Sequence, residues 1–331
     1  MTNQQILDIC EILSCKDNFI IIPHSNPDGD AIGSSLAIFN LLKKMSKKCR
    51  ILCNDPFPKN FEFLSKNSVK KLDDDIFELA SSYDSNLHIS KNEFILSVDV
   101  ADRDLLGKSL KKLVNIDMSI DHHHSCKIFS TYSFVDESAS ATTEIIYEVV
   151  KSLKLLDLEI AKCIYTGILT DTGGFRHPNV TPKTHEIVAQ LLKIGVNNSF
   201  ISKNIFDSKT KEQMKLNYFV LGSLEFFFDQ KCAMIVITKK MMLESNTNKE
   251  DAHCFSCIPR QIKSVLVGIS IREEDENFYK ISLRTENPIN AANLCEKFGG
   301  GGHINAAGCA ISGTLEDVKK KVLNEVKKNL Y

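Results

Sequence analysis

Three side chains that can bind a metal ion lie together in one turn near the start of this chain. His24, Asp28 and Asp30 stand between a short apolar run at 19–22 and an apolar pattern at 31–42. The run predicts a buried strand and the pattern predicts a helix. Two prolines and a glycine favour a tight turn between them. An alternative is purely structural: Asp30 caps the helix and Asp28 shapes the turn.

More side chains of the same kinds stand at the ends of other predicted elements. A strand at 93–98 leads into Asp99, and one at 115–120 leads into a carboxylate and two imidazoles. A helix at 159–169 leads into Asp171. Ligands of open α/β sheets bind at the carboxyl ends of the strands, so we expect these groups at one edge. The expected group is His24, Asp28, Asp30, Asp99, Asp121, His122, His123 and Asp171.

Carboxylates crowded in this way repel one another unless a cation or a proton compensates them. Four of them, Asp28, Asp30, Asp99 and Asp171, carry the charge that two divalent ions would cancel. Mixed carboxylate and imidazole ligands favour manganese, and the ligand types also allow iron, cobalt or zinc as alternatives. A pair of such ions lowers the pKa of bound water and clamps an in-line displacement at phosphorus. The chemistry that this pattern favours is phosphate-ester hydrolysis by a metal-activated hydroxide.

Strands that alternate with helices predict an α/β fold with a parallel Rossmann-like sheet in the first domain. Further predicted elements there are a strand at 50–53 and helices at 6–13, 137–153 and 183–194. A smaller mixed α/β domain follows, with strands at 232–238, 265–271 and 279–284 and helices at 290–297 and 315–330. The predicted division is a first domain at 1–195, a helical linker at 196–223 and a second domain at 224–331.

Composition excludes several classes of protein. The 331 residues carry a formal net charge of -1, without the strong positive charge typical of proteins that hold long duplex nucleic acid. No apolar run is long enough to cross a membrane. Eleven cysteines without a signal-like N-terminus predict free thiols and a cytoplasmic protein. We expect Cys254 and Cys257 to be thiols in or near a core, and the acidic triplet at 73–75 to lie in solvated loops.

The motifs resemble those of the DHH phosphoesterases. Four of them match in order: His24-Ser-Asn-Pro-Asp-Gly-Asp, Val98-Asp, Asp121-His-His and Thr170-Asp-Thr-Gly. A run of four glycines ending in His303, followed by Ala306-Ala-Gly, resembles the motif of the DHH-associated C-terminal domain. The subgroup most similar in pattern is the stand-alone nano-RNases. These act on very short RNAs and dinucleotides, and many also dephosphorylate 3′-phosphoadenosine 5′-phosphate.

The resemblance implies two manganese ions per chain. One would be held by His24, Asp28 and Asp99, and the other by Asp30, Asp99, His122 and Asp171. Asp99 would bridge the two ions and take part in catalysis. Asp121 would orient a ligating imidazole. The neighbouring His124 lies outside the motif, and we expect a structural or exposed role for it.

The resemblance also implies substrate-binding residues. His123 would act in catalysis at the substrate phosphate, and Arg284 would grip the substrate with its planar fork. The glycines would let the backbone approach an anion closely. The implied set is His123, Arg284, Gly300, Gly301, Gly302 and His303. Two departures from the family pattern concern Arg103, whose spacing puts a phosphate role in doubt, and Thr285, which stands where Ser is usual.

Several functions share this chemistry. The first is hydrolysis of short RNA or linear dinucleotides, and its nearest alternative is a cyclic di-AMP phosphodiesterase. An inorganic pyrophosphatase is a weaker alternative because its phosphate-gripping domain uses basic residues rather than this glycine motif. A nucleotide-sensing protein with an idle centre is the alternative outside enzymes. The sequence leaves the oligomeric state open, with a homodimer among the alternatives.

Overall fold

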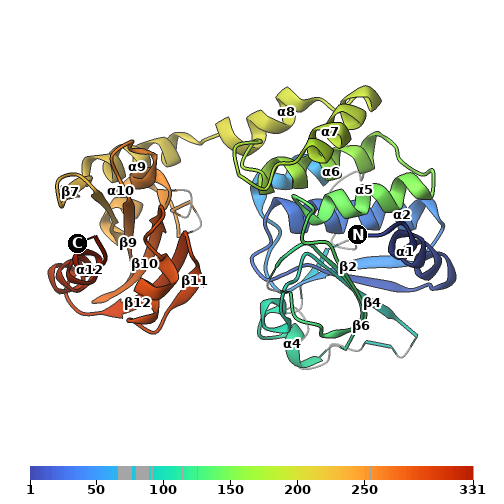
Figure 1. The fold of residues 1–331 in the computed structure, drawn as a ribbon, viewed down its shortest axis with the longest axis horizontal. Helices are drawn as coiled ribbons and strands as arrows, with labels where there is room; N and C mark the ends of the chain where they lie inside the picture. Colours follow the sequence, from blue (N-terminus) through green and yellow to red (C-terminus); the bar gives the residue numbers. More distant parts are fainter. Residues whose placement is uncertain are drawn as a thin grey trace. The chain divides into compact units, whose positions relative to one another are not determined.

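The computed structural model of the chain contains two compact units, at 1–208 and 209–331 (Figure 1). It describes residues 1–65, 77–79, 89–90, 92–113, 115–124, 126–249, 251–252 and 255–330. Each unit has its own sheet and its own apolar core. Within the described residues, no helix has both the length and the apolar character needed to cross a membrane.

The first unit is built on a six-stranded sheet in the order β3-β2-β1-β4-β5-β6, and every pair in it is parallel. The strands are β1 (Phe19–Ile22), β2 (Cys49–Cys53), β3 (Phe77–Leu79), β4 (Phe94–Val98), β5 (Ile116–Asp121) and β6 (Ser130–Val135). Both faces of β1 are buried. Its residues Phe19 and Ile21 join the larger apolar cluster, whereas Ile20 and Ile22 join a smaller one on the other face. Burial on both faces explains why the strand reads as an unbroken apolar run.

The larger cluster on this sheet is formed with a layer of helices (Figure 1). These are α1 (Asn3–Cys15), α2 (Gly29–Lys44), α5 (Thr142–Ser152), α6 (Leu158–Asp171) and α7 (Pro182–Ile194). Short segments complete the unit: η1 (Lys59–Phe61), α3 (Glu62–Ser65), η3 (Arg103–Leu106), α4 (Leu110–Leu113), α8 (Asn198–Ser202) and η4 (Lys203–Asp207). Helices α2 and α6 pack closely because Gly33 lies against the Cys163 carbonyl, where a Cβ atom would come within 2.5 Å of the oxygen. This packing brings the start of α2 beside the end of α6, where Asp30 and Asp171 lie.

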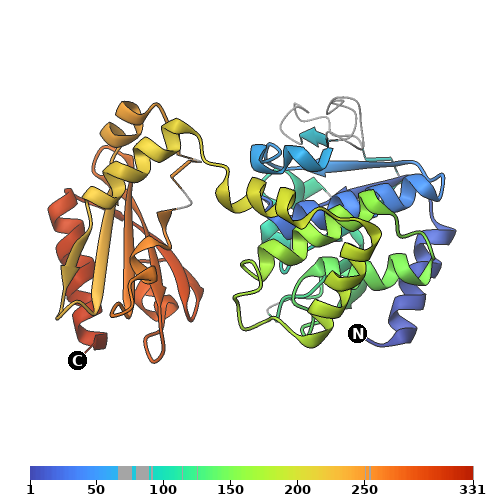
Figure 2. The same ribbon diagram turned by 90° about the horizontal axis from the view of Figure 1, so that it is seen from above.

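The second unit contains a mixed six-stranded sheet in the order β11-β12-β10-β9-β8-β7. Its strands are β7 (Glu225–Phe227), β8 (Cys232–Ile237), β9 (Val267–Asp275), β10 (Phe278–Thr285), β11 (Gly301–His303) and β12 (Ala306–Ser312). Helices α11 (Ala291–Glu296) and α12 (Leu315–Leu330) cover one face (Figure 2). Helices α9 (Lys211–Gly222) and α10 (Lys239–Ser245) pack on the other face, against β8, and η6 (Ile258–Gln261) is a short 3₁₀ helix.

The predicted α/β class is confirmed: a parallel sheet with helices and a second, mixed sheet. The helix predicted from residue 137 begins instead at Thr142, because residues 137–141 form the turn that follows β6. Strands β3, β6, β7, β11 and β12 were not predicted. The prediction of a core thiol is wrong for Cys257, which is exposed. Its partner Cys254 and the acidic triplet at 73–75 lie outside the described residues.

Candidate metal centre

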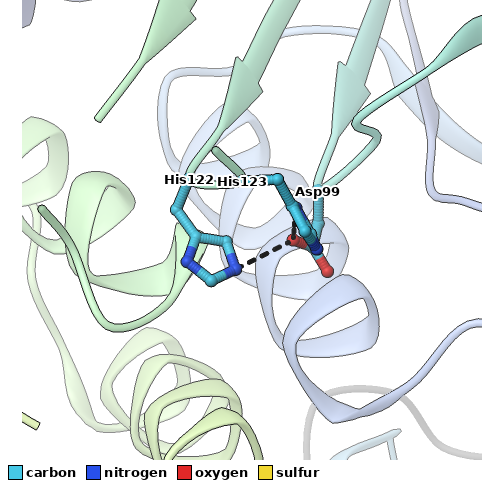
Figure 3. Close-up of side chains that lie close together, drawn as sticks. All are labelled: Asp99, His122 and His123. Carbon is cyan, nitrogen blue, oxygen red and sulfur yellow. Dashed lines mark ion pairs between the residues drawn. The ribbon is translucent and has the colours of Figure 1, made fainter. Parts of the chain in front are cut away.

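Two neighbouring strand ends place an acid and two imidazoles beside each other (Figure 3). Asp99 directly follows β4, and its N–H donates to the Ile120 carbonyl of β5 at 3.0 Å. Its backbone has φ +60°, a left-handed conformation that is uncommon outside glycine but more accessible to Asp and Asn. His122 and His123 directly follow β5, and their rings lie 4.6 Å apart between centroids. The turn at Asp99 directs its carboxylate toward both rings.

A first group of possible ligands contains His24, Asp28 and Asp99, whose ligand atoms lie within 4.8 Å of one another. His24 Nε2 is 3.7 Å from Asp28 Oδ1 and 3.7 Å from Asp99 Oδ2. Asp28 also caps α2, because its carboxylate accepts from the N–H groups of Asp30 and Ala31. Helix capping and proximity to the other two side chains therefore coexist in this residue. The sequence analysis named the same three residues as ligands of the first predicted ion.

A second group contains Asp30, His122 and Asp171, again with ligand atoms within 4.8 Å. His122 Nδ1 lies 3.2 Å from the Ala139 carbonyl, which accepts from a protonated Nδ1 and leaves Nε2 as the ligand atom. Nε2 is 3.0 Å from Asp171 Oδ2 and 3.8 Å from Asp99 Oδ1. The two oxygens of Asp99 thus face different imidazoles, one in each group.

The N-terminus of α5 holds two of the acids in place. Asp30 is fully buried, and its Oδ2 accepts from the Thr142 N–H at 2.6 Å. Its Oδ1 accepts from the Thr143 N–H at 3.1 Å and from the Thr143 hydroxyl at 2.7 Å. The Thr142 hydroxyl donates to Asp99 Oδ1 at 2.9 Å. Sequence reasoning missed these two threonines; a Thr-Thr pair at a helix start, where free N–H groups favour an anion, was the available signal.

Asp121 supports the imidazoles from behind. It is fully buried, and its Oδ1 accepts from the N–H groups of His122 and His123 at 2.8 and 3.3 Å. His123 Nδ1 lies 2.7 Å from the same oxygen. His124 points elsewhere: its side chain is 82% exposed and pairs with Glu137. These contacts fix the orientation of His123 and leave its Nε2 for other partners.

The charges of the site shift several pKa values strongly. Burial, followed by the nearby Asp171, raises the pKa of Asp30 to about 7. Burial and the surrounding carboxylates also raise the pKa of Asp99 well above its usual range. Burial lowers the pKa of His122, but the Asp171 and Asp30 carboxylates outweigh it and raise that pKa to about 9. Burial opposes ionisation of Asp28, yet contact with His24 keeps its pKa below the usual value.

The residues fit a bound divalent cation. Four carboxylates are brought together, and burial and their mutual repulsion raise the pKa values of Asp30 and Asp99, so a bound cation would stabilise their charged forms. His122 Nε2 is buried and makes no hydrogen bond within the described part of the chain, although a carboxylate oxygen is 3.0 Å away. A cation between these atoms would satisfy both. A set of carboxylate oxygens and imidazole nitrogens suits a divalent metal ion.

Apart from His123, the predicted substrate-binding residues lie in the second unit. Arg284 is half-buried in β10, and its Nη1 donates to the Leu283 carbonyl. Gly300 and Gly302 have a packing role, since a Cβ atom would lie 2.2 Å from the Gly308 oxygen or 2.6 Å from the Ala306 oxygen. Gly301 has no atom within 4 Å of its Cβ position. His303 ends β11. Only Gly301 of these three glycines therefore presents an open side.

Comparison with known proteins connects both units to described families. Residues 18–168 match the model of the DHH family, N-terminal domain, and residues 232–331 match the DHHA1 domain. This chain therefore contains a DHH-family N-terminal domain and a DHHA1 domain. Members of this family are hydrolases, and the two matched regions contain the metal-binding candidates of the first unit except Asp171, together with Arg284 and the glycine motif.

Relatives of this DHH protein match it along nearly its whole length. The bifunctional oligoribonuclease and PAP phosphatase NrnA of Thermus thermophilus is 29% identical over 326 residues, covering 97% of this chain and 93% of the relative. The protein of the same name from Bacillus subtilis is 25% identical and covers 92% of both chains. A crystal structure of an exopolyphosphatase-related protein from Bacteroides fragilis is 27% identical, with a TM-score of 0.89, covering 99% of this chain and 96% of that one.

Proposed function

We propose that this protein hydrolyses phosphodiester bonds of short RNA oligonucleotides and linear dinucleotides at a centre of two manganese ions. One observation carries the proposal: two ligand groups share an edge of the sheet, with Asp99 facing an imidazole of each. A shared carboxylate between neighbouring groups is the arrangement expected for paired ions. When bound, such ions supply a nucleophile at neutral pH and stabilise charge on the phosphoryl oxygens.

The chain's own residues prepare this site. Thr142 and Thr143 fix the carboxylates of Asp99 and Asp30, so the ligands do not reorganise during the reaction. Asp121 fixes the orientation of the His123 ring through Nδ1, and His123 is proposed to point at the substrate phosphate. Arg284, Gly301 and His303 are proposed to bind the rest of the nucleotide.

The choice of substrate follows the relatives. Full-length relatives carry the name oligoribonuclease and PAP phosphatase, and both activities hydrolyse a phosphate ester: a diester between nucleotides in the first and a monoester in the second. We include 3′-phosphoadenosine 5′-phosphate as a second substrate on this ground. None of the relatives compared is named a cyclic di-AMP phosphodiesterase, so that alternative is not favoured. The proposed setting is the reducing cytoplasm, because the cysteines of the described chain are free thiols.

A product analysis tests the function. Purified protein with manganese is offered a five-residue RNA, a linear dinucleotide, 3′-phosphoadenosine 5′-phosphate, cyclic di-AMP and pyrophosphate in parallel. The proposal expects mononucleotides from the RNA and the dinucleotide, and inorganic phosphate from the bisphosphate nucleotide. Cleavage of pyrophosphate or cyclic di-AMP alone would contradict it.

A further inference from the structure

One face of the second unit's sheet is only partly covered. The apolar cluster beneath α9 and α10 takes in Ile235 and Ile237 of β8. Of the described residues, none from β9, β10 or β12 belongs to that cluster. Apart from Phe278 on β10, those three strands send their large apolar side chains to the opposite face, under α11 and α12. Within the described residues, η6 lies against Gly268 of β9, and β10 and β12 line open grooves on this face.

The side chains along this open face alternate regularly on β10. Phe278, Lys280, Ser282 and Arg284 are exposed or half-exposed, whereas Tyr279, Ile281, Leu283 and Thr285 between them are buried. The period of two places the first four on one face of the strand. That face carries an aromatic ring, an ammonium, a hydroxyl and a guanidinium in a row.

The neighbouring strand β12 forms a low floor beside this row. In the antiparallel register, Ala306, Gly308 and Ala310 stand opposite Arg284, Ser282 and Lys280. Such small side chains leave the longer ones of β10 standing above the sheet. Two adjoining grooves of about 480 and 460 Å³ result, and both are lined by Lys280, Gly301 and Gly308. Arg284 lines the first groove and Phe278 the second.

The cations of the grooves differ in how far they are neutralised. Arg272 on β9 donates to Glu274 at 2.7 Å and to the Lys249 carbonyl, so its charge is compensated within the protein. Lys280 and Arg284 contact no carboxylate in the described part of the chain. Their two charges remain available for an anion.

We propose that this face is a binding track for single-stranded RNA longer than a dinucleotide, with Lys280 and Phe278 extending the site that begins at Arg284. The inference rests on the proposed function, because it assigns further nucleotides of the same substrate. Lys280 and Arg284 are four residues apart on β10, which is about 14 Å along an antiparallel strand. A phosphate bound at Arg284 therefore leaves Lys280 for a later phosphate of the same strand.

Phe278 completes the track. This residue is 40% exposed at the end of the row, beyond Lys280. Proteins that bind single-stranded nucleic acid combine cations for the backbone with aromatic rings on which bases stack. On β10, Arg284 and Lys280 would contact phosphates of the RNA backbone, and a base would stack on the ring of Phe278. The modest number of free cations suits a chain of a few nucleotides better than a long polymer.

Binding of labelled RNA tests the track independently of catalysis. Fluorescence anisotropy is measured for the full-length protein in chelator, with a five-residue RNA and a dinucleotide, over a series of salt concentrations. Lys280→Gln is compared with Lys320→Gln, an exposed lysine of α12 on the other side of the same sheet. Phe278→Leu removes the ring and keeps an apolar side chain.

The track predicts that Lys280→Gln weakens binding of the five-residue RNA at least ~5-fold. The slope of log affinity against log salt concentration should become shallower by about 0.7, the value for one phosphate contact on a single strand. In Lys280→Gln the affinity for the dinucleotide should change less than twofold. Lys320→Gln should change the affinity for neither ligand. Phe278→Leu should weaken binding of the five-residue RNA by a similar factor. It should leave the salt dependence unchanged, because stacking is not ionic. Equal losses for both RNA lengths, no loss, or the same loss in Lys320→Gln would overturn the track. If RNA binds as predicted but manganese yields no mononucleotides, the proposed hydrolysis fails instead.

Discussion

Removing the metal should make the first unit less stable as the pH rises, which is the opposite of what its many acids would suggest. In the metal-free protein the pKa of Asp30 is about 7, against an unfolded value near 3.8. A raised pKa means that the folded state binds the extra proton. The stability it contributes is complete below about pH 4 and is lost as the pH rises through 7.

The size of this effect follows from the shift. About three pKa units at 1.36 kcal/mol each amount to ~4 kcal/mol for Asp30 alone. His122, whose pKa is raised to about 9, acts in the same direction at higher pH. The pKa values of Asp28 and Asp121 are lowered, so their contributions are complete above about pH 5 and do not change between pH 5 and 9. The net expectation is a decline across that window.

Hydrogen exchange followed by mass spectrometry can measure this decline segment by segment. Peptides of α2 should lose protection from pH 5 to 8 in chelator, after correction for the intrinsic exchange rate, and should keep it when manganese is bound. Peptides of α12 serve as the internal control, because that helix belongs to the other unit. In Asp30→Asn the α2 peptides should be less protected at pH 5, and their protection should depend much less on pH. A metal-free protein whose α2 becomes more stable toward pH 8 would refute the reasoning.

Three substitutions test individual roles. Asp99→Asn tolerates the φ of +60° and keeps the shape, but removes the charge that both ligand groups share; turnover should fall at least ~100-fold and bound metal should drop below two ions. Retention of both ions with normal turnover would exclude the bridging role. Asp121→Asn should lower kcat ~10–100-fold while metal analysis still finds two ions, since this acid contacts His123 rather than the proposed ligand atoms. Arg284→Lys should raise KM about 10-fold with little change in kcat; a fall in kcat at constant KM would place this residue in the transition state instead.

The parts of the centre that sequence could predict are those fixed by strand ends. His24, Asp99 and His122 each stand one or two residues beyond a buried apolar strand, and a parallel sheet brings such positions together. Asp171 followed from the end of an equally clear helical pattern.

The parts that escaped prediction depend on contacts between distant segments. Thr142 and Thr143 are neutral residues, and only the packing of α2 against α5 reveals that they bind Asp30. The short edge strands β3 and β7 have three residues each, too few for a periodic pattern. Sequence also could not distinguish Gly301, which is open, from Gly300 and Gly302, which allow close packing of strands.

The most direct test of the account is anomalous X-ray diffraction from crystals grown with manganese. We expect two peaks about 3.5–4 Å apart. One should lie beside His24 and Asp28 and the other beside Asp30, His122 and Asp171, with Asp99 contacting both. A single peak, or peaks away from these side chains, would contradict the claim that the acids and imidazoles at this edge of the sheet hold a pair of ions.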